Sequence, residues 1–576
     1  MSQEQGKDMS QYFYRASAAD FMKIPGLTIA YWLSKNKSKL FELPKISSHA
    51  KVCVGMQTGE NAKWIRFWFE VSLDKTNQDN GERKWTPCNK GGEFRKWFGN
   101  GVDVINWESN GWDIKNLATG AYIRNEDEYF KPAITWSRIT SDALSFRFAD
   151  ANCVHNDASC FMTGDPLHLK YLLEYLNSKI ASSLVEDMNP TLNLLPGQMS
   201  GTPYLSIING RGEECVEISR EDWNSYELSL IFKKSPLIKA KFHQLTLESV
   251  YEKLRIYWRE MALKMHSLEE ENNSQFIEAY GLQDEFAPDV PLKEITLTCN
   301  PHYRYGGNRS DEELETLLQC DTLRELVSYA IGCMMGRYSL DKPGLILASQ
   351  GETLHDYLRQ IPAPRFAPDD DAILPLTDQE WFADDATNRF REFVLVVWGD
   401  EHLQQNLNFV AESLCLHAIK PKRGESALDT IRRYLSTQFF KDHVRTYKKR
   451  PIYWLFSSGK HKAFECLVYL HRYNEGTLSR MRTEYVIPLS AKLNSYAEKI
   501  EQDKDASSSA AETKRMEKEL AILHKQQAEL AEFDEKLRHY ADQRISLDLD
   551  DGVKVNYGKF GDLLAEVKAV TGEKQQ

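Results

Sequence analysis

The sequence predicts an α+β fold, in which a β-rich domain is followed by mostly α-helical domains and a C-terminal antiparallel coiled-coil hairpin. From about residue 46 to 235, short β-branched and aromatic runs alternate with Gly, Asn and Asp turns, which is the pattern of strands. From about 236, apolar residues recur at three- and four-residue spacing, which is typical of amphipathic helices. Near the C-terminus apolar residues recur every seven positions, as in a coiled coil.

The β-rich domain is expected to span residues 46–235 and to contain one helix. Its strand candidates are KVCVGMQTG, WIRFWFEVS, DVINWE, AITWSRIT and LSFRFAD. The helix is expected over residues 166–188, because apolar side chains follow helical spacing from Leu169 to Leu184. Residues 1–45 precede the domain as a loosely ordered lead-in.

The helical half divides where its composition changes. We expect a helical domain at 236–361, an acidic, proline-bearing linker at 362–388 and a basic helical domain at 389–482. A hairpin of two coiled-coil arms follows at 483–545, because a Ser- and Asp-rich stretch interrupts the apolar repeat, and a tail covers 546–576. The apolar positions are Leu489, Leu493, Tyr496 and Ile500 on the first arm and Met516, Leu523, Leu530 and Leu537 on the second.

Composition excludes several classes of protein. With 42% hydrophobic and 27% charged residues among 576, the chain is neither disordered nor of low complexity. Mean hydropathy is −0.52, and the lack of an apolar run of about 18 residues predicts that nothing spans a membrane. The polar first residues do not resemble a signal peptide, so we expect a cytoplasmic location.

The ten cysteines are scattered, and none forms a C-x-x-C pair. Cys153, His155 and Cys160 come closest to a metal cluster, but no second pair with ligand spacing follows them. We therefore expect reduced, partly buried thiols rather than a zinc site.

Net charge is −12, but the charge is unevenly distributed. Residues 430–482 carry twelve Lys and Arg against three acidic residues. Within this segment a cluster surrounds an aromatic strand and could neutralise nucleic-acid phosphates, or could form a charged rim on a helical domain. The cluster comprises Lys448, Lys449, Arg450, Lys460, His461 and Lys462.

The tetrapeptide Asn300-Pro301-His302-Tyr303 differs at one position from the Asn-Pro-Pro-aromatic box of amino-methyltransferases. The run KEITLT before it is expected to be a strand, which fits such a box. However, no strand leads into a Gly-rich cofactor turn upstream, and no alternating β–α pattern could build the parallel sheet. We therefore expect Asn300 to be a turn residue ahead of Pro301.

Two segments carry a family resemblance: GGEFRKWFGNGVDVINWESNGWDIKN at 91–116 and YFKPAITWSRIT at 129–140. They resemble the target-recognition domain of large adenine-specific DNA methyltransferases of the type IIG, Eco57I-like group. Further matches are AYGLQDE at 279–285, YAIGCMMGRYSLDKPGL at 329–345 and the segments at 448–473 and 550–566. The last two narrow the resemblance to the methyltransferases of BREX phage-exclusion systems.

The resemblance implies a part of such an enzyme that recognises a DNA sequence and clamps the duplex. In that group the methyl-donor and Asn-Pro-Pro-Tyr modules precede the recognition domain, so residues 1–45 are expected to lead in from such a module. We expect no cofactor on this chain, S-adenosylmethionine in the complete enzyme, and no methyl transfer by the chain alone. The expected partner is double-stranded DNA, and further candidates are a separate N-terminal methyltransferase half and other BREX proteins.

Side chains in the resembling segments could read bases, since Arg and Lys pair with guanine and Asn with adenine in the major groove. The candidates are Arg95, Lys96, Trp97, Asn100, Trp136 and Arg138, together with Lys448, Lys449, Arg450, Lys460 and Lys462 on phosphates. The competing interpretation places the two tryptophans in the core, which we favour for them, and leaves the cations solvated. A rival function is a non-catalytic adaptor that docks partner proteins through its helical half.

Overall fold

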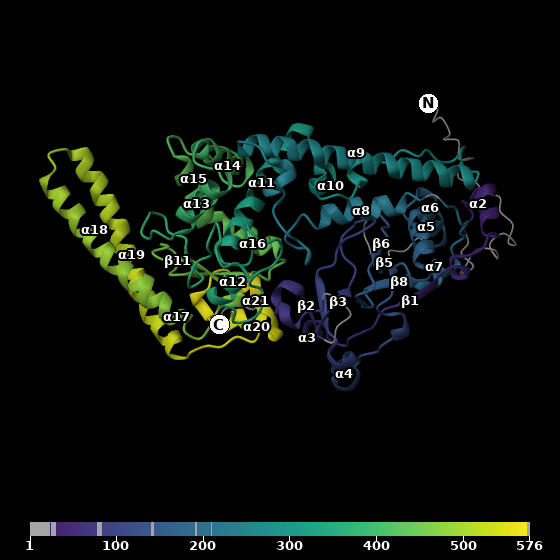
Figure 1. The fold of residues 1–576 in the computed structure, drawn as a ribbon, viewed down its shortest axis with the longest axis horizontal. Coiled ribbons are helices and arrows are strands. Elements are labelled where there is room, and N and C mark those ends of the chain that lie inside the picture. Colours follow the sequence, from purple (N-terminus) through teal and green to yellow (C-terminus); the bar gives the residue numbers. More distant parts are fainter. Residues whose placement is uncertain are drawn as a thin grey trace, which may run out of the picture. The chain divides into compact units, whose positions relative to one another are not determined.

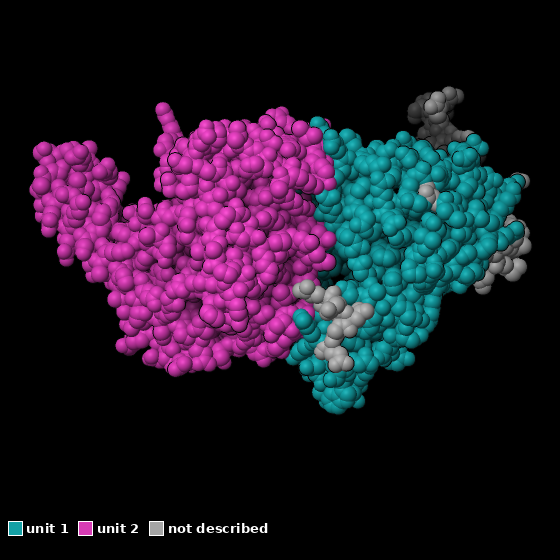
Figure 2. Space-filling model, viewed as in Figure 1, with its two compact units in different colours: residues 1–65, 77–223, 258–306 teal, residues 66–76, 224–257, 307–576 magenta. Residues whose placement is uncertain are grey.

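The computed structural model describes residues 24, 30–77, 83–139, 143–189, 193–208 and 210–572, so most of the predicted lead-in lies outside the described residues. The α+β class is confirmed (Figure 1). Two compact units are distinguished in Figure 2. Unit 1 comprises residues 1–65, 77–223 and 258–306, and unit 2 comprises residues 66–76, 224–257 and 307–576. Within the described part of the chain, no helix combines the length and apolar character needed to cross a bilayer.

Unit 1 is built on two small four-stranded sheets. The first has the order β1-β8-β5-β6 and is antiparallel at each described pairing. Its strands are β1 (Lys51–Val54), β8 (Ser159–Thr163), β5 (Ala133–Ser137) and β6 (Arg147–Ala149). The second sheet has the order β2-β4-β3-β7. Its strands are β2 (Ile65–Phe67), β4 (Asp103–Asn106), β3 (Trp85–Asn89) and β7 (Val154–His155).

The described part of unit 1 also contains helices, before, between and after these strands in the sequence. They are α2 (Lys35–Leu40), α3 (Asn61–Trp64), α4 (Glu108–Leu117), α5 (Pro166–Leu176), α6 (Lys179–Met188), α7 (Pro196–Gly201), α8 (Gly212–Trp223) and α10 (Pro301–Tyr305). The 33-residue helix α9 (Leu247–Ala279) begins in unit 2 and continues into unit 1.

The single helix expected over 166–188 is two helices, α5 and α6. The break falls at Asn177 and Ser178, where Ser178 leaves the helical conformation and caps α6. Its hydroxyl accepts a hydrogen bond from the Ala181 amide and donates one to the Tyr175 carbonyl. Apolar spacing continues across this break, so periodicity alone does not locate it.

Unit 2 contains a three-stranded sheet of order β10-β11-β9 and a set of helices. The strands are β10 (Tyr453–Ser457), β11 (Glu465–Tyr469) and β9 (Ile373–Pro375). The helices are α11 (Asp311–Met334), α12 (Leu354–Gln360), α13 (Ala386–Trp398), α14 (Leu403–His417), α15 (Ala427–Tyr434), α16 (Phe440–Thr446), α17 (Thr477–Arg480), α18 (Ile487–Ala506), α19 (Ala510–Asp542), α20 (Gly552–Gly558) and α21 (Val567–Thr571).

The segment 362–388, expected to be an acidic linker, contains a strand and residues that pack within unit 2. Its residues Ile373–Pro375 form β9, which pairs with β11 at the edge of the sheet. Asp385 is buried, caps α13 through the Asn388 amide and forms an ion pair with Arg432. The acidic composition therefore serves capping and ion pairing inside unit 2, which the charge pattern alone does not reveal.

The C-terminal helical hairpin is confirmed, with α18 and α19 side by side (Figure 1). Tyr496 bonds Glu519 at 2.6 Å, whereas the earlier Asn494 meets the later Gln527 at 2.9 Å, so the arms are antiparallel. The predicted apolar positions are buried, except that Tyr496 and Met516 are half-buried. Ser509 caps α19 at the turn.

We predict that Leu530→Ala weakens the hairpin by about 2–5 kcal/mol, because it opens a cavity at a side chain that is 1% exposed. Ile522→Ala on the same helix is the matched control, since its side chain is 57% exposed and its loss should cost under ~0.5 kcal/mol. Hydrogen exchange of peptides from α18 and α19 measures the free energy of opening. Equal protection in the two variants would contradict the predicted packing.

Candidate nucleic-acid interface

The turn at 91–101 lies in unit 1 and is held to strand β6 by backbone hydrogen bonds. The Trp97 amide donates to the Phe146 carbonyl at 2.9 Å, and the Phe148 amide donates to the Trp97 carbonyl at 2.7 Å. Trp97 and Asn100 have left-handed backbone conformations. Gly99 also has a positive φ of 129°, and a Cβ there would lie 2.5 Å from Nε of Arg95. These contacts and positive φ angles constrain the backbone conformation of the turn.

The Arg95 guanidinium points into unit 1. It forms an ion pair with Asp222 at 2.7 Å and donates to the Thr298 hydroxyl at 2.9 Å and to the Phe98 carbonyl at 2.8 Å. Asp222 also accepts the backbone amides of Thr298 and Cys299 at 2.7 and 2.9 Å. Arg95 therefore joins the turn to the end of α8 and to the segment before α10.

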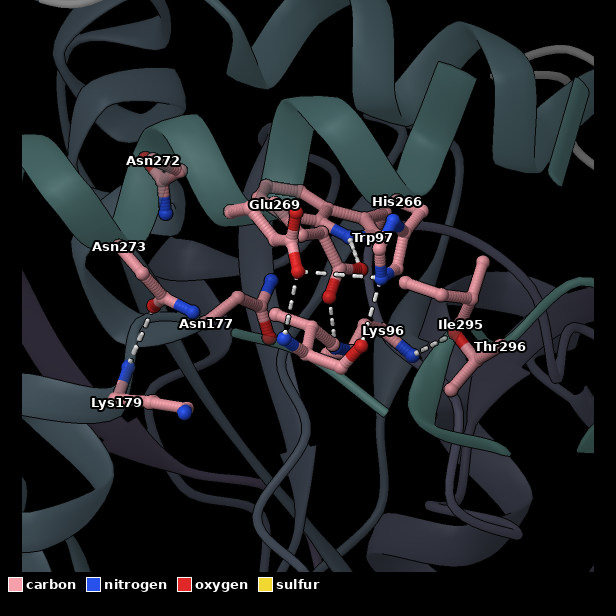
Figure 3. A network of polar contacts seen from close by, with 12 residues as sticks. Lys96, Trp97, Asn177, Lys179, His266, Glu269, Asn272, Asn273, Ile295 and Thr296 are labelled. Carbon is pink, nitrogen blue, oxygen red and sulfur yellow. Dashed lines mark hydrogen bonds and ion pairs between the residues drawn. The ribbon is translucent and has the colours of Figure 1, made fainter. Parts of the chain in front are cut away.

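Lys96 and Trp97 share one carboxylate, that of Glu269 on α9 (Figure 3). The Lys96 ammonium pairs with one oxygen, and the Trp97 indole donates to the other at 2.8 Å. The Lys96 amide additionally donates to the Thr296 hydroxyl at 2.9 Å. The side chains of Lys96 and Glu269 are only 8% and 3% exposed, so water screens this ion pair poorly.

Arg95, Lys96 and Trp97 are consequently interior side chains in this structure. Trp97 and Trp136 are each 1% exposed, and the indole of Trp136 donates to the Leu194 carbonyl at 3.3 Å. The interpretation that places the tryptophans in the core is thus confirmed. DNA contact by these four residues stays a prediction, and it requires them to leave partners that already satisfy their polar groups.

Asn100 and Arg138 are half-buried, so part of each remains accessible. Gly92 and Ser137 exchange two hydrogen bonds, of 3.1 and 3.0 Å, which tie the turn to the end of β5. A Cβ on Gly92 would lie 2.6 Å from the Asn100 amide nitrogen, so Asn100 lies beside the same edge. Arg138 follows Ser137, and its Nε has no hydrogen-bond partner among the described residues.

Asn300, expected to be a turn residue ahead of Pro301, is the N-cap of α10. Its side chain accepts from the His302 amide at 3.2 Å and donates to the carbonyls of Leu292 and Ile295 at 2.8 and 2.9 Å. The strand expected over 293–298 is not formed, and a 3-10 turn at Leu292–Glu294 covers its beginning. The hydroxyl of Tyr303 donates to the Phe94 carbonyl, so the tetrapeptide supports the 91–101 turn.

The predicted basic cluster of unit 2 is divided by strand β10. Lys448 and Lys449 are exposed just after α16, and the Lys448 ammonium lies 6.0 Å from the ring centre of Phe67. Lys460 and Lys462 lie in the turn between β10 and β11, at the other end of β10. The two halves therefore lie at opposite ends of a five-residue strand.

Two members of the cluster have partners within the protein. Arg450 is half-buried and donates to the Val570 carbonyl at 3.2 Å, with Nε 3.8 Å from the Glu70 carboxylate. The Lys462 ammonium binds Glu465 at 2.8 Å and the Ser436 carbonyl at 2.7 Å. Lys448, Lys449 and Lys460 are thus the more available cations.

Sequence reasoning missed two exposed cations on α16. Lys441 and Arg445 follow the i, i+4 spacing that places residues on one helix face, which was the available signal. Lys448 and Lys449 follow the end of α16, in left-handed backbone conformations. The acid between Lys441 and Arg445, Asp442, is buried and pairs with Arg324 and the Tyr434 hydroxyl. We call Lys441, Arg445, Lys448 and Lys449 the α16 basic face.

The histidine and cysteines considered for zinc are packed as core residues. The His155 ring stacks on Phe161 with centroids 3.8 Å apart, and burial lowers the pKa of His155 to about 3. The Cys153 thiol accepts from the Asn89 amide at 3.0 Å. In the part of the chain that is described, no three His, Cys, Asp or Glu side chains are grouped to hold a metal ion.

Comparison with known proteins gives two relatives that match nearly the whole chain. It is 44% identical over 562 residues to the adenine-specific methyltransferase BrxX of Escherichia coli O9:H4 (strain HS), covering 96% of this chain and 46% of that protein. It is 36% identical over 577 residues to the adenine-specific methyltransferase PglX of Lacticaseibacillus casei (strain Zhang), covering 95% of this chain and 45% of that protein. The chain thus spans about half the length of these relatives. No protein-family model matches it.

We predict that Lys96→Met destabilises the protein by about 3–5 kcal/mol, because it leaves the Glu269 carboxylate buried without its cation. Lys264→Met is the matched control, since Lys264 pairs with Glu214 where both side chains are at least half exposed, and its loss should cost under ~1 kcal/mol. Urea unfolding, followed by tryptophan fluorescence, measures both. Equal midpoints for the two variants would show that the buried pair does not hold the turn.

Proposed function

Because this chain belongs to the PglX family of adenine-specific methyltransferases, to which it is related along nearly its whole length, we propose that it recognises and clamps duplex DNA for adenine methylation. In this proposal the methyl donor, S-adenosylmethionine, and the transfer chemistry belong to a module outside this chain. Modifying an adenine within a duplex requires extrusion of the base while the surrounding DNA is held in place, and holding the DNA is the task assigned here.

The observation that supports clamping most directly is the α16 basic face. Lys441, Lys448 and Lys449 are exposed, and none of their side chains has an ion-pair partner in the described chain. Arg445 is also exposed and reaches Asp442 only at 3.8 Å. Since Asp442 is paired with Arg324 inside unit 2, the positive charge of this face is not neutralised locally. Such a surface binds the phosphate backbone without regard to sequence.

For sequence recognition we propose the edge formed by the 91–101 turn and the end of β5. Asn100 and Arg138 are the partly accessible residues there, and their side chains match the major-groove edges of adenine and guanine, respectively. Arg95, Lys96 and Trp97 support this edge from inside through Asp222 and Glu269. If substitution of Asn100 or Arg138 changes which DNA sequence is preferred, and leaves the salt dependence of DNA binding unchanged, that residue reads a base.

We predict that the triple variant Lys441→Ala/Lys448→Ala/Lys449→Ala binds all duplex sequences more weakly. The slope of log affinity against log salt should fall in magnitude by roughly 2 to 3, since three cations no longer release counterions. Arg450 is left intact because it also holds the Val570 carbonyl. Fluorescence anisotropy at several salt concentrations gives the slope.

The matched control for this experiment is Lys514→Ala/Lys518→Ala/Lys525→Ala on α19, which removes the same charge from exposed positions interspersed with carboxylates. It should bind DNA like the parent. If both triple variants behave alike, the α16 basic face is not the clamp. If the parent itself does not bind duplex DNA, a role in docking partner proteins becomes the better account.

We further predict that the purified chain neither binds S-adenosylmethionine nor transfers its methyl group to DNA. Isothermal titration calorimetry with S-adenosylmethionine and transfer of labelled methyl to duplex DNA measure the two steps. Stoichiometric binding of S-adenosylmethionine by this chain alone would place the cofactor site on it and contradict the proposal that the cofactor belongs to another module.

A further inference from the structure

The loop at 418–426, which connects α14 to α15, is an exposed basic segment that the sequence analysis did not single out. Lys420, Lys422 and Arg423 are exposed, and none of their side chains has an ion-pair partner among the residues described. The loop is fixed at both ends. The Ile419 amide donates to the Leu414 carbonyl at 3.1 Å, and Ser426 caps α15.

The one carboxylate in this loop is neutralised inside unit 2. Glu425 accepts two hydrogen bonds from Nε of Arg433, at 2.8 and 3.1 Å, and a third at 2.5 Å from its Nη2. The Arg433 guanidinium holds the pKa of Glu425 below its ordinary value. The Asp429 carboxylate, in the first turn of α15, accepts a hydrogen bond of 2.6 Å from the Ser426 hydroxyl. Arg433 is the ion-pair partner of Glu425, and Lys422 attracts the same carboxylate at longer range, so Lys420 and Arg423 keep their charge uncompensated.

A continuous helix joins this loop to the α16 basic face. Residues 427–446 are helical throughout, as α15, a π-helical turn at Leu435–Phe439 and α16. At 1.5 Å per residue, these twenty residues are about 30 Å long. One turn of B-form DNA is about 34–36 Å, so the length of this helix is close to one turn of the duplex.

We propose that loop 418–426 is a second phosphate-contact site for duplex DNA, and that the helix of residues 427–446 sets its spacing from the α16 basic face. This inference rests on the proposed function, since it assigns a further contact to the same partner. Three exposed cations on a fixed loop fit a regularly spaced polyanion, and a connecting helix of about one DNA turn in length favours a duplex over an acidic protein.

The test compares the parent with Lys420→Ala/Lys422→Ala/Arg423→Ala on duplexes of 8 and 24 base pairs. An 8-base-pair duplex is about 27 Å long and too short to reach both sites, whereas 24 base pairs span both. On the long duplex we expect the variant to lose about tenfold or more in affinity near 0.1 M salt and to flatten the salt slope by roughly 2 to 3. On the short duplex the loss should be much smaller, because the α16 basic face still binds it.

The α19 triple variant Lys514→Ala/Lys518→Ala/Lys525→Ala again controls for the change in net charge. A loop variant that matches this control on the 24-base-pair duplex would overturn the second site and leave the loop to solvation or an acidic protein partner. That outcome differs from failure of the proposed function, in which the parent binds neither duplex. Because all three substituted residues are exposed, unchanged thermal unfolding of the variant verifies that its fold is intact.

Discussion

The arrangement of the turn at 91–101 depends on two buried carboxylates that lie far from it in the sequence. Asp222 holds Arg95 across 127 positions, and Glu269 holds Lys96 and Trp97 across more than 170. Buried ion pairs of this kind contribute little net stability compared with apolar packing, yet loss of one partner is costly. We infer that the pairs are valuable for fixing one path of the turn, and thereby the position of Asn100 beside β5.

In unit 2, two carboxylates pair with arginines of the protein and leave neighbouring cations exposed. Asp442 pairs with Arg324 beneath the α16 basic face, and Glu425 pairs with Arg433 beneath the loop at 418–426. In both places the count of charges in the sequence understates the exposed positive charge. This explains how a chain of net charge −12 can still present surfaces suited to a polyanion.

The tetrapeptide at 300–303 shows how a local match to a catalytic box can have a structural role. The side-chain amide of Asn300 forms hydrogen bonds with backbone groups that precede and follow it in the sequence. The Tyr303 hydroxyl donates a hydrogen bond to the Phe94 carbonyl in the turn. The residues of the tetrapeptide therefore belong to the same support as Arg95 and Lys96.

The sequence by itself determined the features that depend on neighbouring residues. Apolar periodicity and turn residues gave the α+β class and the C-terminal hairpin, and Asn300 was identified as a turn residue because it precedes Pro301. Only the tertiary structure decided that Arg95 and Lys96 are interior and that β9 pairs with β11. These depend on partners roughly ninety or more residues away, which neither propensity nor charge count records.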